Sequence, residues 1–300
     1  MANRILGWFL ILGIIILLLS IVLPGSKDAN PNDPAAVAQP PWIETALSGI
    51  LAAIHEIKTS LASSSSSDSS DTNAGSSSGA ATGEDPNEVF NRAYQANERG
   101  EYKKAVEEYS KYLELVPGDA SGYYNRGLAL YTMKQYEDAV KDFDKAVEID
   151  PNKTAAYLYK GYGNEMIDDC MQAIEDFQKA IDLGENKNSE LYGHKARCEN
   201  KDEDYTAGLE SARKAVNLDK KNAYALFELG YAQYALGKYA ESVASYSKTL
   251  SFNPNDEVAY HNRGLAYVFL KKTSLACKDF RKSLDLGYQD SGKRLKEYCK

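Results

Sequence analysis

The side chains most often used in catalysis or metal binding are few and scattered in this chain. It has three histidines, His55, His194 and His261, and none lies near a nucleophile with a third polar partner. His194 and Cys198 are four residues apart and supply only half of the ligands that a zinc site usually needs. No G-x-S-x-G or H-E-x-x-H motif is present. We therefore expect no enzyme, no metal site and no cofactor.

The cysteines and the net charge exclude further classes of protein. The four cysteines, Cys170, Cys198, Cys277 and Cys299, form no C-x-x-C pair, so the sequence indicates neither a zinc site nor a disulfide framework. The 300 residues include 35 Lys and Arg against 43 Asp and Glu, a formal net charge of -8. Because this balance creates no basic field for phosphates, we expect no nucleic-acid partner.

From residue 86 onward, small residues recur at a nearly constant interval. Six of them lie 34 or 35 residues apart: Ala105, Ala139, Ala173, Gly208, Ser242 and Ala276. A Gly or Ala precedes each of them by twelve residues, and large apolar residues such as Tyr123 and Phe143 fill the places between. A period of this length is typical of stacked helical hairpins, in which small residues let helices approach closely. The sequence therefore predicts an all-α solenoid.

Individual copies of this pattern resemble the tetratricopeptide (TPR) family. YYNRGLALYTMKQYEDAVKDFDKAVEIDP from Tyr123 to Pro151 and YHNRGLAYVFL from Tyr260 to Leu270 follow the family pattern almost position by position. The resemblance implies a right-handed α-solenoid of about six helix-turn-helix repeats, closed by a polar capping helix. The expected segments are 86–119, 120–153, 154–187, 188–222, 223–256 and 257–290 for the repeats and 291–300 for the cap.

The fourth repeat is irregular. It is one residue longer than the others, lacks the final proline at Lys220, and has Gly208 and Ala212 where other copies have Ala and an aromatic residue. We expect a local change in curvature, either as a functional hinge or as a degenerate copy that the solenoid tolerates. Elsewhere, helices are expected to end at prolines or at left-handed glycine caps, Gly184 and Gly287.

The family resemblance implies a concave groove, lined by the first helix of each repeat, that receives an extended peptide or a partner's helix. Positions 2, 5, 9 and 12 of this helix form a stripe separate from the packing positions. The predicted groove residues are Phe90, Tyr94, Tyr124, Leu128, Tyr131, Tyr162, Arg197, Phe227, Tyr231, Tyr234 and His261. Such an aromatic surface suits a peptide with apolar and hydrogen-bonding groups. The alternative is that some of these tyrosines pack against the neighbouring repeat.

One known kind of TPR groove does not match this chain. A groove that holds the acidic end of a chaperone carries Lys and Asn where Phe90 and Tyr94 stand here. It carries Lys and Arg where Ala155 and Tyr159 stand, and only Asn125 fits. We therefore expect a different ligand.

The chain before the repeats begins with an apolar segment. Residues 5–23 include no charge over nineteen positions, and a helix of about 28 Å just spans the hydrocarbon core of a membrane. Arg4 places the short segment 1–4 in the cytoplasm and the repeats outside, by the positive-inside tendency. The alternative is a signal peptide cleaved near Ala38.

Three segments separate this apolar stretch from the repeats. Residues 24–41 contain five prolines and predict a stiff spacer. Residues 42–61 have apolar side chains at intervals of three and four, which indicates either a short coiled coil that forms a homo-oligomer or an amphipathic helix lying on lipid or on the repeats. Residues 62–85 are rich in Ser and Gly and predict a disordered, flexible linker.

These features predict a single-pass protein of the cell membrane that acts as a scaffold for protein–protein interaction. Its partner is a peptide segment or a helix of another protein. Two alternatives remain open: a structural oligomer clustered through residues 42–61, and an accessory subunit of a secretion or glycosylation complex.

Overall fold

The computed structural model describes residues 83–299. Several predictions concern residues outside this range: the cytoplasmic segment 1–4, the transmembrane helix 5–23, the spacer 24–41, the coiled coil or amphipathic helix 42–61 and most of the linker 62–85. The described range contains thirteen helices and no strand. None of these thirteen helices has the length and apolar character needed to cross a membrane.

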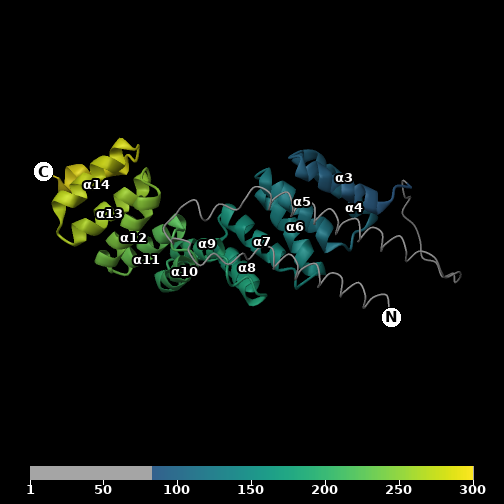
Figure 1. Ribbon diagram of the computed structural model, residues 1–300, viewed down its shortest axis with the longest axis horizontal. Coiled ribbons are helices and arrows are strands. Elements are labelled where there is room, and N and C mark those ends of the chain that lie inside the picture. The colour runs from purple at the N-terminus through teal and green to yellow at the C-terminus, as the bar shows by residue number, and fades with distance from the viewer. Residues whose placement is uncertain (1–82, 300) are drawn as a thin grey trace, which may run out of the picture. The chain divides into compact units, whose positions relative to one another are not determined.

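The helices form six successive pairs and one final helix, in agreement with an all-helical TPR-like solenoid (Figure 1). The first helices of the pairs are α3 (Pro86–Glu98), α5 (Ala120–Thr132), α7 (Thr154–Met166), α9 (Ser189–Lys201), α11 (Ala223–Ala235) and α13 (Glu257–Phe269). The second helices are α4 (Tyr102–Leu115), α6 (Tyr136–Ile149), α8 (Cys170–Asp182), α10 (Tyr205–Leu218), α12 (Tyr239–Phe252) and α14 (Thr273–Asp285), and α15 (Asp290–Tyr298) follows. Each helix packs on its neighbours in the sequence, and first helices of adjacent pairs also contact one another.

Short polar side chains begin the first helices, because the first turn leaves backbone N–H groups without partners. Five such side chains accept hydrogen bonds from these groups: Asp85, Asp119, Asn188, Asn222 and Asp256. Gly184 and Gly287, which follow second helices, both have a φ of 112°. The left-handed glycine caps predicted at these two positions are therefore confirmed.

Close approach of the two helices in a pair depends on a small residue that faces an aromatic ring sixteen positions later. A Cβ atom added to Gly161 would lie 2.7 Å from the Phe177 ring, and one added to Gly264 would lie 2.6 Å from the Phe280 ring. The same arrangement recurs at Gly127 with Phe143 and at Gly230 with Tyr246. All four rings are fully buried. In four of the six pairs, a buried ring is therefore seated against glycine backbone.

An ion pair with the same sixteen-residue spacing also joins the helices of a pair. Arg126 of α5 donates from Nε and Nη2 to the carboxylate of Asp142 in α6, at 2.8 and 2.7 Å. Its Nη1 donates to Ser110 Oγ of the preceding pair at 3.1 Å. One guanidinium thus links three helices and satisfies a carboxylate that is only 5% exposed.

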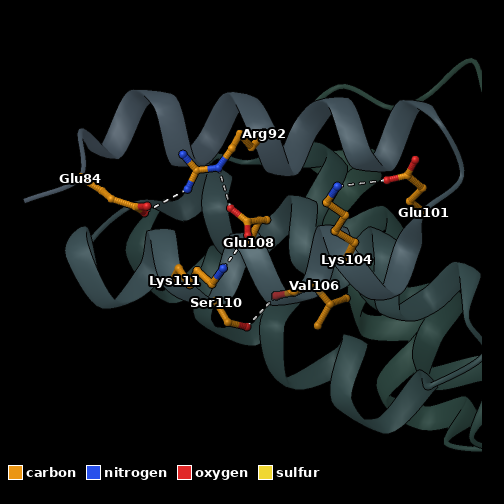
Figure 2. Close-up of polar contacts among 8 residues, drawn as sticks. All are labelled: Glu84, Arg92, Glu101, Lys104, Val106, Glu108, Ser110 and Lys111. Carbon is orange, nitrogen blue, oxygen red and sulfur yellow. Dashed lines mark hydrogen bonds and ion pairs between the residues drawn. The ribbon is translucent and has the colours of Figure 1, made fainter. Parts of the chain in front are cut away.

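The first and later pairs carry versions of this link. In Figure 2, Arg92 of α3 donates to Glu108 of α4 at 2.9 Å and to Glu84 at 3.0 Å. The remaining links are Lys160 with Asp176 and Asp144, and Arg263 with Asp279 and Ser247. The sequence analysis missed this series, although its basic residues follow the same period as the small residues.

The last helix, α15, covers the end of the solenoid. Ser291 at its start is buried, and its hydroxyl lies 2.7 Å from His261 Nδ1. A disulfide joins Cys277 in α14 to Cys299, which directly follows α15. The sequence analysis, which found no sign of a disulfide framework, missed this single pair. Its 22-residue separation matches no short motif, and the two cysteines meet only because α15 packs back against α14.

Filling the space opposite an aromatic ring should destabilise the solenoid. We expect Gly161→Ala to lower the free energy of unfolding by about 1–3 kcal/mol, because the ring must shift to admit the new methyl group. The loss should appear even though alanine favours helix by up to about 1 kcal/mol. Urea unfolding of the full chain measures it.

Gly292→Ala is the matched control. Its Cβ would lie 3.6 Å from Leu284, an ordinary contact, so the stability should stay the same or rise slightly. If the two variants were equally stable, the Phe177 ring would not depend on the absence of a side chain at Gly161.

Candidate functional site

First helices of neighbouring pairs meet through their side chains along a line that we call the seam. At three of the five steps, position 12 of one first helix contacts position 6 of the next. The three contacts are Tyr131 with Tyr159 (ring centroids 6.1 Å apart), Glu165 with His194 (2.7 Å) and Asn200 with Glu228 (2.9 Å). The seam is thus aromatic between α5 and α7, charged between α7 and α9, and polar between α9 and α11.

Glu165 is the centre of the charged step. It is 6% exposed, and its carboxylate lies 2.7 Å from His194 Nδ1 and accepts from Arg197 Nη1 at 2.6 Å. Tyr224 of α11 also donates to it at 3.3 Å. Burial alone would raise the pKa of Glu165, but His194 and Arg197 outweigh burial and hold this pKa below its ordinary value. The positive charge of Arg197 is therefore compensated inside the protein.

Glu228 is the second buried carboxylate of the seam, and no cation forms an ion pair with it in the described residues. It is 6% exposed, and its Oε2 accepts from Asn200 Nδ2 at 2.9 Å. Burial raises the pKa of Glu228 to about 7. This effect is larger than the opposite effects of the hydrogen bond from Asn200 and of the more distant charge of Arg197. Two other titratable groups act on this pKa: Glu165 raises it and His194 lowers it.

Two hollows open beside Glu228. One, of about 580 Å³, lies between α9, α11 and the start of α13, and its lining includes Arg197, Tyr224, Phe227, Glu228, Asn253, Asp256 and Val258. The other, of about 190 Å³, is lined by Arg197, Asn200, Lys201, Phe227, Glu228 and Tyr231. Because both share Arg197, Phe227 and Glu228, we treat them as one site and call it the Glu228 site.

The irregular fourth repeat supports this site. Gly208 in α10 stands where other copies have Ala or Ser, and a Cβ there would lie 2.2 Å from Asn200 Oδ1. The missing side chain makes room for Asn200, whose Nδ2 donates to both the backbone oxygen and the carboxylate of Glu228, at 3.1 and 2.9 Å. One departure from the repeat pattern therefore positions the polar step of the seam.

The structure brings three of the predicted groove residues together at the Glu228 site: Arg197, Phe227 and Tyr231. Tyr231 is 37% exposed, and Phe227 lies edge-on against the buried Tyr246. Glu228 itself was missed. The available signal was its charge, since it is the sole charged residue in α11, whose sequence is AYALFELGYAQYA.

Most of the other predicted groove residues are partly buried. These partly buried residues are Phe90, Tyr124, Leu128, Tyr131, Tyr162 and Tyr234. Tyr162, for example, lies between Phe177 and His194, with ring centroids 5.3 and 4.9 Å away. Burial raises the pKa of Tyr124 and of Tyr131 to about 12. Tyr94 remains free, with 49% of its surface exposed.

His261 does not reach the groove. It is 5% exposed and faces Ser291, Phe280 and Tyr288 at the capped end of the solenoid. Sequence spacing placed it on the stripe, but in the last repeat the capping helix covers that position. His194 and Cys198 also lack further ligands: residues 83–299 contain no cluster of three or more His, Cys, Asp or Glu that could hold a metal ion.

Comparison with known proteins identifies the repeats. Family models described as tetratricopeptide repeat match residues 120–153 and 258–286, and one described as TPR repeat matches 94–134 and 231–269. Tetratricopeptide repeats are therefore present in this chain. Repeats of this kind generally form scaffolds for protein–protein interaction and are typically not enzymes.

Solved structures share the fold. The crystal structure of YrrB, described as a TPR protein with an unusual peptide-binding site, is 24% identical, with a TM-score of 0.54, over 61% of this chain and 93% of that one. MamA from Desulfovibrio magneticus RS-1 is 21% identical, with a TM-score of 0.54, over 59% of this chain and 99% of that one. At this level of identity the likeness concerns the fold alone.

Glu228 should reduce stability at neutral pH. Its pKa is raised from 4.5 to about 7 on folding, so the folded protein is penalised as the pH rises through this interval and the carboxylate ionises. We expect Glu228→Gln to increase the free energy of unfolding by about 1–3 kcal/mol at pH 8 and by almost nothing at pH 4. Denaturant unfolding at several pH values measures this difference.

Glu210→Gln, at an exposed position of α10, is the control and should change stability little at any pH. If the free energy of unfolding differs between Glu228→Gln and the parent protein by the same amount at every pH, Glu228 is not a buried, unpaired carboxylate.

Proposed function

We propose that this protein is a membrane-tethered scaffold that binds a peptide segment or helix of a partner protein at the Glu228 site and the neighbouring first helices. The observation that carries the proposal is the site itself. It combines a cavity of about 580 Å³ with aromatic side chains and a buried carboxylate, on the first helices that the TPR resemblance assigns to binding. Cavities of this size with few, specifically placed polar groups are typical binding sites.

Exposed aromatic residues at the rim support the same proposal. Tyr224 and Tyr231 of α11 are each 37% exposed, so part of each ring is open to a partner. Tyrosine contributes apolar contact area and a hydrogen-bonding hydroxyl, and it is enriched among the residues that dominate binding energy. Partner binding would cover both rings.

Residues 5–23 would hold the scaffold in the membrane, with the repeats on the outer side. The apolar length of this segment and the position of Arg4 support this topology. The disulfide between Cys277 and Cys299 supports it independently, because disulfides form and persist mainly in oxidising compartments outside the cytosol. The tether then presents the Glu228 site to proteins of the cell envelope or exterior.

Substitution of the rim aromatics should weaken partner binding without unfolding the repeats. With a photo-crosslinking amino acid at Lys201, which lines the smaller hollow, the protein should form covalent adducts with its partner in intact cells. Adding Tyr224→Ala and Tyr231→Ala should lower the adduct yield about tenfold or more, as expected when two interface aromatics are truncated.

Phe252→Ala is the matched control, because Phe252 is an exposed aromatic residue (47%) on the second helix α12. It should leave the adduct yield unchanged. Equal yields from the double variant and the parent would contradict binding at this site. In the same cells, external protease should release the repeats, and their protection until lysis would contradict the proposed topology.

A further inference from the structure

The carboxylate of Glu228 has no cation beside it and only one hydrogen-bond donor among the described residues. Of its two carboxylate oxygens, Oε2 accepts from Asn200, whereas Oε1 has no hydrogen-bond partner in residues 83–299 and is not sealed from solvent. A buried carboxylate normally has a cation or several hydrogen bonds to offset the loss of hydration. Here one neutral amide is the only direct partner, and the carboxylate forms part of the wall of the Glu228 site.

The cations near the cavity are already paired. Arg197 donates to Glu165 at 2.6 Å, and Lys201 forms an ion pair with Asp168. A second carboxylate, Asp256, lines the cavity from the start of α13, where one of its oxygens caps the helix. Uncompensated charge in the cavity is therefore negative, which disfavours an acidic ligand and favours a basic one.

The apolar lining matches the shape of a basic side chain. Phe227 and Val258 line the cavity with Glu228, and Tyr224 stands at its rim. A lysine or arginine side chain has an aliphatic stem that packs on apolar surface and a cation that interacts with the faces of aromatic rings. One such residue would use both the rings and the carboxylate.

We propose that the Glu228 site binds a lysine or arginine side chain of the partner segment, with the cation on Glu228 and the stem against Phe227. This inference rests on the proposed function, since it specifies the chemistry of the segment bound there. The fourth and fifth repeats would then be specific for basic residues, a specificity that the aromatic groove residues alone do not provide.

The stability cost that we predict for the carboxylate in the free protein is consistent with this role. A glutamine would keep the shape of Glu228 and could still accept from Asn200, without the desolvation of a charge. A buried charge that lowers stability and lines a cavity is explained if that charge binds a ligand. Glu228→Gln is therefore a variant in which a loss of binding does not arise from unfolding.

The test uses the full chain and mixtures of short peptides with blocked termini. The central residue is fixed as Arg, Lys, Gln or Glu, and the remaining positions are randomised. We expect the Arg and Lys mixtures to bind at least about tenfold more tightly than the Gln mixture, which corresponds to about 1.4 kcal/mol. Glu228→Gln should abolish this preference, and Glu210→Gln should behave as the parent protein does.

Each other outcome contradicts a defined part of the account. If all mixtures bind equally, or if the Glu mixture binds best, the proposed specificity for basic residues is wrong, whereas peptide binding itself stands. If the preference for Arg and Lys survives in Glu228→Gln, another residue receives the cation. If no mixture binds, peptide binding at this site fails and the inference fails with it.

Discussion

The close approach of two helices through a glycine that faces an aromatic ring is the constraint on which the rest of this structure depends. At Gly161 and Gly264, a single added methyl group would lie within 2.7 Å of the ring sixteen residues later. This contact sets the distance between the helices of a pair, and the basic residues of the first helices then link each pair to the one before it. Stacking of rigid pairs in turn brings first helices together and creates the seam.

The fold follows from features that repeat along the sequence. The period of 34 or 35 residues and the glycine caps at Gly184 and Gly287 predict the pairs and several of their ends, because these are local constraints that each copy meets in the same way. The ion pairs, such as Arg126 with Asp142, also follow this period and are predictable in principle. Contacts that occur only once, such as the disulfide at Cys277, are not.

The candidate site was only partly predictable for a related physical reason. The position of a residue on a helical stripe says which way its side chain leaves the helix, but not which neighbour covers it. Tyr162 and His261 both lie on the predicted stripe, yet one packs against Phe177 and the other is covered by the capping helix. Glu228 lies beside the stripe and lines the cavity, because Asn200 of the preceding repeat holds it there. Such contacts depend on how successive repeats are rotated.

The ionisation of Glu228 tests the central claim most directly. Carbon-13 NMR of the side-chain carboxyl groups in the full-length protein, assigned with the glutamine variant, reports this pKa with and without a bound arginine peptide. The account predicts a pKa of about 7 in the free protein and a decrease of about one unit or more when the cation is bound. A pKa near 4.5 in the free protein, or no change when the peptide binds, would contradict it.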